Sequence, residues 1–218
     1  MNLEYPSELQ ARFEQGIVGE DYALGEVVGA KELAGRFQVP VEQMSKVLRA
    51  ACRKGLVAPV EPGGSDFRVL GLVKTDMESV FTHTAKAGFK PTSLVRAVEV
   101  EPATHEVAEK LSVEVGSPVY RYVRTRNVDG QALANQTNYI PYEVCPGLEH
   151  DDVFRYSFQR LLEEKYLAVL VEMREWFRLV SATTEDREIL DLPEGSSVLI
   201  IERIALGATG WPLVWANL

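Results

Sequence analysis

A β-hairpin in residues 120–141 is the feature that most constrains how this chain can fold. Two runs rich in aromatic and β-branched residues flank Asp129-Gly130, a dipeptide that favours a two-residue type I′ turn. Counting outward from such a turn predicts these opposite pairs: Val128 with Gln131, Arg126 with Leu133, Arg124 with Asn135, and Tyr122 with Thr137. Side chains two apart share one face of a strand, so one face would gather two guanidinium groups among amides, hydroxyls and aromatic rings.

This predicted face is suited to a small anionic ligand. Arginine binds a carboxylate or a phosphate through two parallel hydrogen bonds, and Arg124 and Arg126 would lie side by side. Asn135 or, one position along, Gln136 would supply the amide. The alternative interpretation is a solvated sheet face on which the arginines serve only solubility.

Composition places the chain among ordinary globular proteins. Its 218 residues suffice for one large or two small domains, and 46% of them are hydrophobic and 25% charged. No apolar run approaches a membrane span, and no signal peptide opens the chain. The two cysteines lack a CxxC spacing and the three histidines lack metal-ligand spacing. We therefore expect a cytoplasmic protein without a metal or another cofactor.

The distribution of charge argues against a protein that wraps nucleic acid over its whole surface. The formal net charge is −9, and residues 1–70 carry eight Lys and Arg against ten Asp and Glu. Residues 41–55 are locally basic, because they hold four cations (Lys46, Arg49, Arg53 and Lys54) and one acid, Glu42. Such a cluster is either a basic helix on an acidic body or a solvated helix face.

Residues 1–70 follow the pattern of a winged helix-turn-helix. Apolar residues at helical spacing predict helices over residues 6–15, 30–37 and 41–54, with Pro40 separating the last two and Gly55 ending the third. Two short strands over residues 56–60 and 66–69 flank a glycine-containing turn, which is the expected wing.

The same region resembles the DNA-binding domain of GntR-type bacterial regulators. The matching segments are Gly19 to Gly25, Lys31-Glu32-Leu33-Ala34, Leu48-Arg49-Ala50-Ala51 and Gly55-Leu56-Val57. In that family the third helix enters the major groove and the wing lies along the minor groove or backbone. The resemblance implies phosphate contacts from Lys31, Lys46 and Arg49, base contacts from Gln43 and Ser45, and a wing contact at Gly64.

Several positions depart from the GntR pattern where the family contacts DNA. The family usually has Pro-Ser-Glu-Arg before Glu-Leu-Ala, whereas this chain has Val28-Gly29-Ala30-Lys31. Its third helix opens at Pro40-Val41 instead of Ser-Arg, and its wing lacks the usual arginine between glycines. Fewer cations imply weaker DNA binding, because phosphate contacts supply much of the affinity.

The second half predicts an α+β domain built on a six-stranded antiparallel sheet. Strands are expected over residues 92–100, 116–127, 131–141, 168–180, 197–206 and 211–218, and helices over 76–87, 102–111, 152–165 and 184–190. This half is similar to the UTRA effector domain of the HutC-like branch of the GntR family, which has a chorismate-lyase-like fold. The matching segments are Gly88-Phe89-Lys90-Pro91, Arg124-Thr125-Arg126, Tyr139-Ile140-Pro141 and Leu199 to Arg203.

The UTRA resemblance implies which residues bind the effector. Arg124, Arg126 and Ser157 match the family's anion-binding positions, and Phe158 replaces the leucine that follows the serine. Asn135 or Gln136 stands where an acid is frequent. Near the end, Val214 and Trp215 replace Glu and Tyr, and the chain stops at Leu218, short of the residues that usually close the site. We expect an anionic effector that is less sugar-like and more apolar than an amino-sugar phosphate.

The sequence therefore predicts a transcriptional regulator, most simply a homodimeric repressor. Its winged helix-turn-helix would span residues 1–70, a connector 71–75, and the effector domain 76–218. Effector binding would change the domain orientation through the connector and so alter the affinity for operator DNA. A degenerate regulator that keeps the fold but has lost DNA contact is one alternative. An enzyme is the other, although the sequence contains no catalytic motif.

Overall fold

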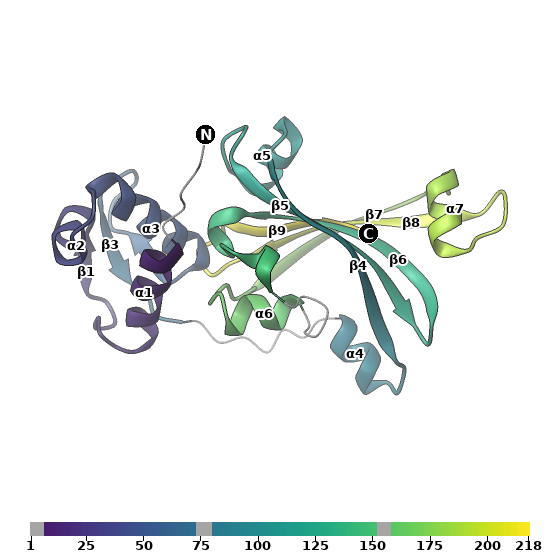
Figure 1. The fold of residues 1–218 in the computed structure, drawn as a ribbon, viewed down its shortest axis with the longest axis horizontal. Coiled ribbons are helices and arrows are strands. Elements are labelled where there is room, and N and C mark those ends of the chain that lie inside the picture. The colour runs from purple at the N-terminus through teal and green to yellow at the C-terminus, as the bar shows by residue number, and fades with distance from the viewer. Residues whose placement is uncertain (1–6, 73–79, 152–157) are drawn as a thin grey trace.

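The computed structural model describes residues 7–72, 80–151 and 158–218. Residues 7–72, here called the N-terminal unit, form three helices and a small sheet that lie at one end of a long six-stranded sheet (Figure 1). The helices are α1 (Ser7–Val18), α2 (Ala30–Phe37) and α3 (Val41–Lys54). The strands β1 (Val27–Gly29), β2 (Val57–Pro59) and β3 (Asp66–Val69) pair in the order β1-β3-β2.

Local sequence signals set the ends of α2 and α3, and both helices have the predicted bounds. Gln38 ends α2 in the left-handed conformation with φ 57°, and Gly55 ends α3 in the same way with φ 82°. Met44, Val47 and Leu48 of α3 are buried in the core of the N-terminal unit. Strand β1, which was not predicted, adds three residues that complete the small sheet.

The predicted six-stranded antiparallel sheet is confirmed. Its strand order is β4-β5-β6-β9-β8-β7, and every neighbouring pair is antiparallel. The strands are β4 (Pro91–Pro102), β5 (Pro118–Val128), β6 (Gln131–Pro141), β7 (Glu172–Ser181), β8 (Ser197–Leu206) and β9 (Pro212–Asn217). The helices are α4 (Val80–Lys86), α5 (His105–Leu111), α6 (Phe158–Glu164) and α7 (Thr184–Leu190), and two 3-10 turns are η1 (Tyr142–Val144) and η2 (Leu148–His150). The predicted helices over 76–87 and 152–165 extend into residues outside the described ranges.

The hairpin turn is confirmed, but the predicted register beyond it is wrong. Asp129 and Gly130 have φ angles of 50° and 84°, as a type I′ turn requires. A register shift follows at once, since Asn127 pairs with Ala132 whereas Arg126 pairs with Ala134. Leu133 is therefore an extra residue in β6, which is a β-bulge. The observed pairs are Arg124 with Gln136 and Tyr122 with Asn138, in place of Arg124 with Asn135 and Tyr122 with Thr137.

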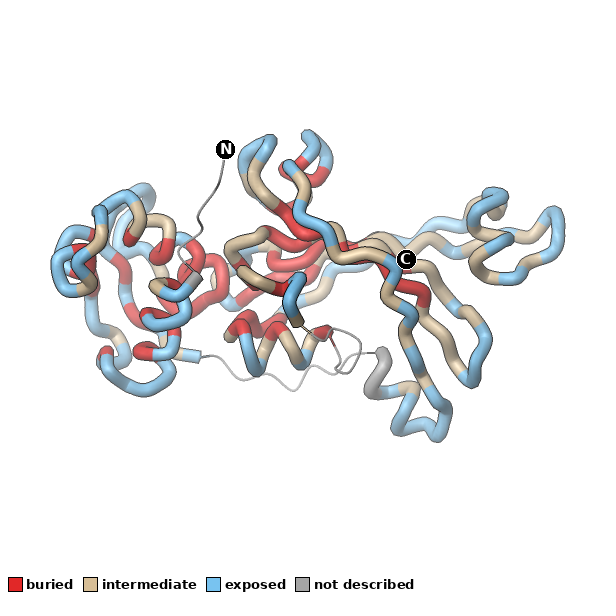
Figure 2. The backbone as a smooth tube through the Cα atoms, viewed as in Figure 1, coloured by how far each residue is buried: buried red, intermediate tan, exposed pale blue. Residues whose placement is uncertain are grey.

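The core of the large sheet lies at its centre, and its outer parts are exposed (Figure 2). On one face α5 packs over Val119 and Trp215, and on the other Phe158 of α6 packs against Tyr122 with ring centroids 5.1 Å apart. The β7–β8 pair, with α7 at its tip, projects beyond this core (Figure 1). The face with Tyr122 is thus covered near the N-terminal unit and open farther out.

Candidate functional site: an arginine-lined pocket and its contact with α3

A pocket of about 650 Å³ opens on the face of the sheet that carries Arg124 and Arg126. It spans β5, β6, β9 and β8 and is bordered by α6 and by residues of α7. The bulge in β6 sets its composition, because it brings Gln136, instead of Asn135, onto the face of Arg124. This volume suits a small metabolite.

Arg124 is held firmly in the floor of the pocket. Its residue is only 4% exposed, and its Nε donates a hydrogen bond of 2.9 Å to Oε1 of Gln136. The guanidinium lies over the rings of Tyr122 and Phe158, at 5.1 and 5.9 Å from their centroids. These contacts fix the plane of the guanidinium, so it is preorganised for an anion.

Arg126 shares the same amide oxygen. Its Nε donates to Oε1 of Gln136 at 3.2 Å, and its Nη1 donates to Oγ of Ser93 on β4 at 3.3 Å. Gln136 Nε2 in turn donates to Oδ1 of Asn138 at 2.9 Å. Gln136 therefore orients both guanidinium groups through one shared neutral oxygen.

Both guanidinium groups are destabilised in their charged form. Burial lowers the pKa of Arg124 below its usual range. Burial, and secondly the positive charge of Arg124, lower the pKa of Arg126 to about 9. A bound anion would remove part of this cost, because it would supply the negative charge that the two side chains share.

Arg203 of β8 is a pocket residue that the sequence analysis did not identify as functional. It lines the same cavity, and its Nε donates to Oε1 of Glu175 on β7 at 2.6 Å. The sequence placed Arg203 only within a family segment, because its position beside the first two arginines depends on the pairing of β8 with β9. The rest of that side of the pocket is apolar, and it includes Leu170, Ile201 and Val214.

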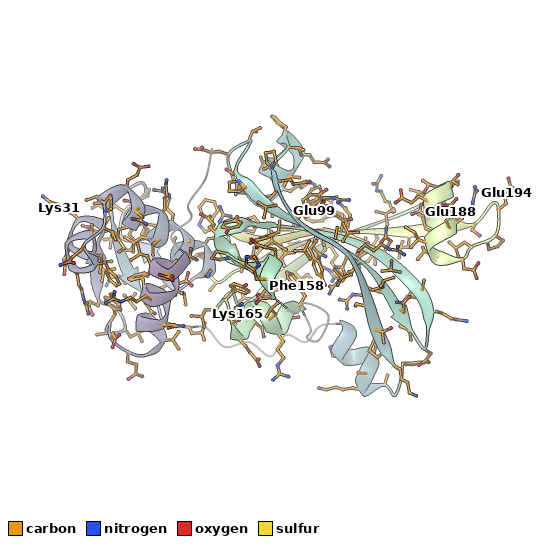
Figure 3. The ribbon with its side chains drawn as sticks, viewed as in Figure 1. Lys31, Glu99, Phe158, Lys165, Glu188 and Glu194 are labelled. Atoms are coloured by element: carbon orange, nitrogen blue, oxygen red, sulfur yellow. The ribbon has the colours of Figure 1, made fainter. Side chains whose placement is uncertain are left out.

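The other residues that were predicted to bind the effector lie at different places relative to the pocket. Phe158 of α6 is buried against the sheet and lines the pocket (Figure 3). Asn135 pairs with Thr125 and so shares the face of Thr125, which is opposite to that of Arg124, although it also contributes to the lining of the pocket. Ser157 lies outside the described residues.

The described residues contain no group of three or more His, Cys, Asp or Glu side chains placed to hold a metal ion. Within them, too, no helix has the length and apolar character needed to cross a membrane.

The residues predicted to contact DNA lie on the surface of the N-terminal unit. Lys31, Arg49 and Gly64 are exposed, and Lys31 projects at the end farthest from the large sheet (Figure 3). Lys46 Nζ lies 3.4 Å from a carboxylate oxygen of Glu42. The two predicted base-contacting side chains are half-buried: these are Gln43 and Ser45, and the hydroxyl of Ser45 donates to the carbonyl of Val41 at 2.8 Å.

The end of α3 is buried against the large sheet through a cluster that we call the Arg53 anchor. Arg53 Nε donates to Oε1 of Glu143 at 2.7 Å, and its Nη atoms donate to the carbonyl oxygens of Leu111, Ser112 and Pro212. Its guanidinium also lies 4.9 Å from the centroid of Trp211. Arg53 is thus unavailable to DNA. Lys54 is also buried, 2.7 Å from Glu14, so neither residue belongs to a solvated basic face.

Comparison with known proteins shows which protein family this chain resembles in sequence. The UTRA domain matches residues 86–218 of this chain. The HTH-type transcriptional regulator YurK of Bacillus subtilis is 26% identical over 126 residues, which are 58% of this chain and 52% of YurK. The HTH-type transcriptional regulator GgaR of Escherichia coli K12 is 26% identical over 190 residues, which are 81% and 73% of the two chains.

The chain belongs to the GntR/UTRA-type regulators.

The crystal structure of PhnF from Mycobacterium smegmatis shares the fold of this regulator along nearly its whole length. The two superpose with a TM-score of 0.61 and 17% identity, over 96% of this chain and 92% of PhnF. The match to YurK covers about half of that relative's length, as does the match to GmuR of Bacillus subtilis at 53%. The named relatives are transcriptional regulators, which are not enzymes.

Proposed function

We propose that this chain is a cytoplasmic, homodimeric transcriptional repressor whose affinity for operator DNA is set by a small anionic metabolite. The observation that carries the proposal is the pair of guanidinium groups, buried Arg124 and half-buried Arg126, in a pocket of about 650 Å³. We assign DNA binding to a winged helix-turn-helix of residues 1–70, effector binding to residues 76–218, and the connection to residues 71–75. The proposed subfamily is HutC-like.

The pocket supports an effector that is anionic at one end and apolar at the other. Arg124, Arg126 and Arg203 place positive charge around one part of the cavity. Ile201 and Val214 offer no hydrogen-bonding side chain where a sugar would present hydroxyl groups. Leaving such hydroxyl groups unpaired is costly, so we propose a carboxylate or phosphate joined to an apolar or aromatic group.

The exposed part of the N-terminal unit supports DNA contact. We propose phosphate contacts from Lys31, Lys46 and Arg49, a base contact from Gln43, and a wing contact at Gly64. Ser45 can contact a base only through its remaining lone pairs, because its proton is used within α3. Modest affinity that weakens as salt is added is the expected consequence.

Direct contact between α3 and the large sheet supports coupling between the effector pocket and the proposed DNA-binding surface. The sequence predicts coupling through the connector at residues 71–75, most of which lies outside the described residues. The Arg53 anchor provides a route that does not require the connector. Effector binding that shifts β8 or β9 would move the end of α3, and with it the spacing of the two recognition helices in a dimer.

A degenerate regulator remains the second candidate, because specific observations favour it. The net charge is −9, the ammonium group of Lys46 is paired with Glu42, and the hydroxyl of Ser45 is satisfied within its own helix. In that case the chain would bind the effector and dimerise without binding an operator.

Two measurements test the proposal. Fluorescence anisotropy with DNA from upstream of the chain's own gene, at two salt concentrations, should show selective binding that weakens as salt is added. A thermal-shift panel of anionic metabolites should stabilise the protein most with aryl or alkyl carboxylates and phosphates. Absence of DNA binding at low salt would favour the degenerate regulator, and stabilisation by sugar phosphates alone would contradict the proposed effector class.

A further inference from the structure

The accessible side chains of α3 lie toward its N-terminus. The last turn is buried, because Arg53 bonds to the large sheet and Lys54 pairs with Glu14. Ahead of it, the exposed or half-buried positions that start the helix are Val41, Glu42, Gln43, Ser45 and Lys46. In a helix-turn-helix, the N-terminal residues of the second helix contact base edges in the major groove. These five side chains are therefore the ones that would read an operator.

Val41, the first residue of α3, presents an isopropyl group to solvent and is 48% exposed. Such a side chain forms no hydrogen bond with a base. The major groove displays a methyl group on C5 of thymine, and an apolar side chain contacts it favourably. A single exposed valine is common on protein surfaces, so the assignment of Val41 depends on the side chains around it.

Ser45 lies one turn after Val41 on the same side of α3. Its hydroxyl donates to the carbonyl oxygen of Val41 at 2.8 Å, so toward DNA its oxygen can only accept. Guanine displays two acceptors in the major groove and no donor, whereas adenine displays its N6 amino group as a donor. Because thymine and adenine form one base pair, an A·T pair offers both the methyl group for Val41 and the donor for Ser45.

The charges at the start of α3 disfavour guanine. Guanine O6 and N7 are read most often by Arg or Lys. Lys46 is the one cation of residues 41–48, and its ammonium group lies 3.4 Å from the carboxylate of Glu42. That carboxylate belongs to a side chain that is 81% exposed, and it would repel the two guanine acceptors. Gln43 agrees with this preference, because a glutamine side chain matches N6 and N7 of adenine.

We infer, on the basis of the proposed operator binding, that α3 reads A·T base pairs and that Val41 recognises thymine through its 5-methyl group. The contact occurs once in each half-site of the operator. Ser45 accepts a hydrogen bond from the adenine of the same or the adjacent pair. Lys31 and Arg49, which are exposed, supply phosphate contacts that do not depend on base sequence.

Replacing thymine with deoxyuridine tests the methyl contact without altering the protein. The full chain first selects its binding site from a randomised duplex library at low salt, and the half-sites should require A·T pairs. Each thymine of the selected site is then replaced singly by deoxyuridine, which lacks only the 5-methyl group. At one thymine of each half-site the affinity should fall about fourfold, the effect of losing the burial of one methyl group.

A variant of Val41 assigns the contact to its residue. Val41→Ala removes both methyl groups of the side chain, so it should weaken binding to the thymine operator and abolish the deoxyuridine effect at that thymine. Val100→Ala on β4 is the matched control, because Val100 is 46% exposed and lies in the large sheet. It should leave the affinity and the deoxyuridine effect unchanged.

The outcomes separate thymine recognition from the proposed function. Deoxyuridine without effect at every thymine, or an effect that persists in Val41→Ala, would overturn the role of Val41 and leave the repressor proposal intact. A selected site whose required base pairs are all G·C would overturn the A·T preference in the same way. If no sequence is selected at low salt, operator binding and thymine recognition both fail, and the degenerate regulator is favoured.

Discussion

Replacing Arg53 with alanine should uncouple the N-terminal unit from the large sheet. The substitution removes four hydrogen bonds, one of them to the carboxylate of Glu143, and the contact with Trp211. Removing one partner of a buried ion pair costs about 3–5 kcal/mol. The lower end, about 3 kcal/mol, is appropriate here, because the side chain of Glu143 is 22% exposed and water can reach it.

Differential scanning calorimetry measures this effect directly. We expect the wild-type chain to unfold in one transition, because the Arg53 anchor holds both parts together. In Arg53→Ala, the transition of the N-terminal unit should separate and move down by about 12–24 °C, the shift that about 3 kcal/mol produces in a unit of this size. Arg53→Lys, which keeps the charge without the planar fork, should be intermediate.

A matched control is Arg68→Ala. Arg68 is exposed, and its side-chain hydrogen bond to the carbonyl of Gly25 stays within the N-terminal unit. Its loss should change stability by less than about 0.5 kcal/mol and leave a single transition. If Arg53→Ala also unfolds in one transition within about 1 kcal/mol of the wild type, the anchor does not couple the two parts and the reasoning fails.

Three further predictions concern the pocket and the DNA face. Gln136→Glu should stabilise the protein by about 1–2 kcal/mol in thermal unfolding and abolish stabilisation by sulfate, because hydrogen bonds from Arg124 and Arg126 to a carboxylate are stronger than those to the amide oxygen. Gln136→Leu, which removes the shared acceptor, should not stabilise. Stabilisation of the wild type by sulfate should fall as pH rises through about 9, where Arg126 loses its proton, and Arg126→Met should remove that dependence. Arg49→Ala should reduce the slope of log affinity against log salt by about 1 in anisotropy, whereas Arg121→Ala on β5 should not.

The site could be predicted from sequence only as far as local rules extend. Asp129-Gly130 determines its turn through the positive φ angles that both residues adopt, and alternation then places Arg124 and Arg126 on one face. The bulge at Leu133 depends on how β6 packs within the whole sheet, so counting outward from the turn could not locate it. That one residue decides whether Asn135 or Gln136 contacts the arginines.

The interface between the two parts was less predictable than the elements themselves. Helices α2, α3 and α7 have the expected bounds, because their caps and apolar spacing are local. Arg53, in contrast, has the local pattern of a solvated cation, and its partner Glu143 lies 90 residues away. Only tertiary packing distinguishes it from Arg49, one helical turn earlier, which is exposed.

The arrangement of β8 and β9 provides a route by which a ligand in the pocket would displace the end of α3. Both strands line the pocket, through Arg203 and Val214, and the turn between them runs against the end of α3. In that turn the hydroxyl of Thr209 donates to the carbonyl of Cys52 at 2.7 Å. The approach is so close that a Cβ added at Gly207 would lie 2.9 Å from the carbonyl oxygen of Arg53. Because this contact is closely packed, a displacement of β8 or β9 cannot be absorbed at the contact and would move the end of α3.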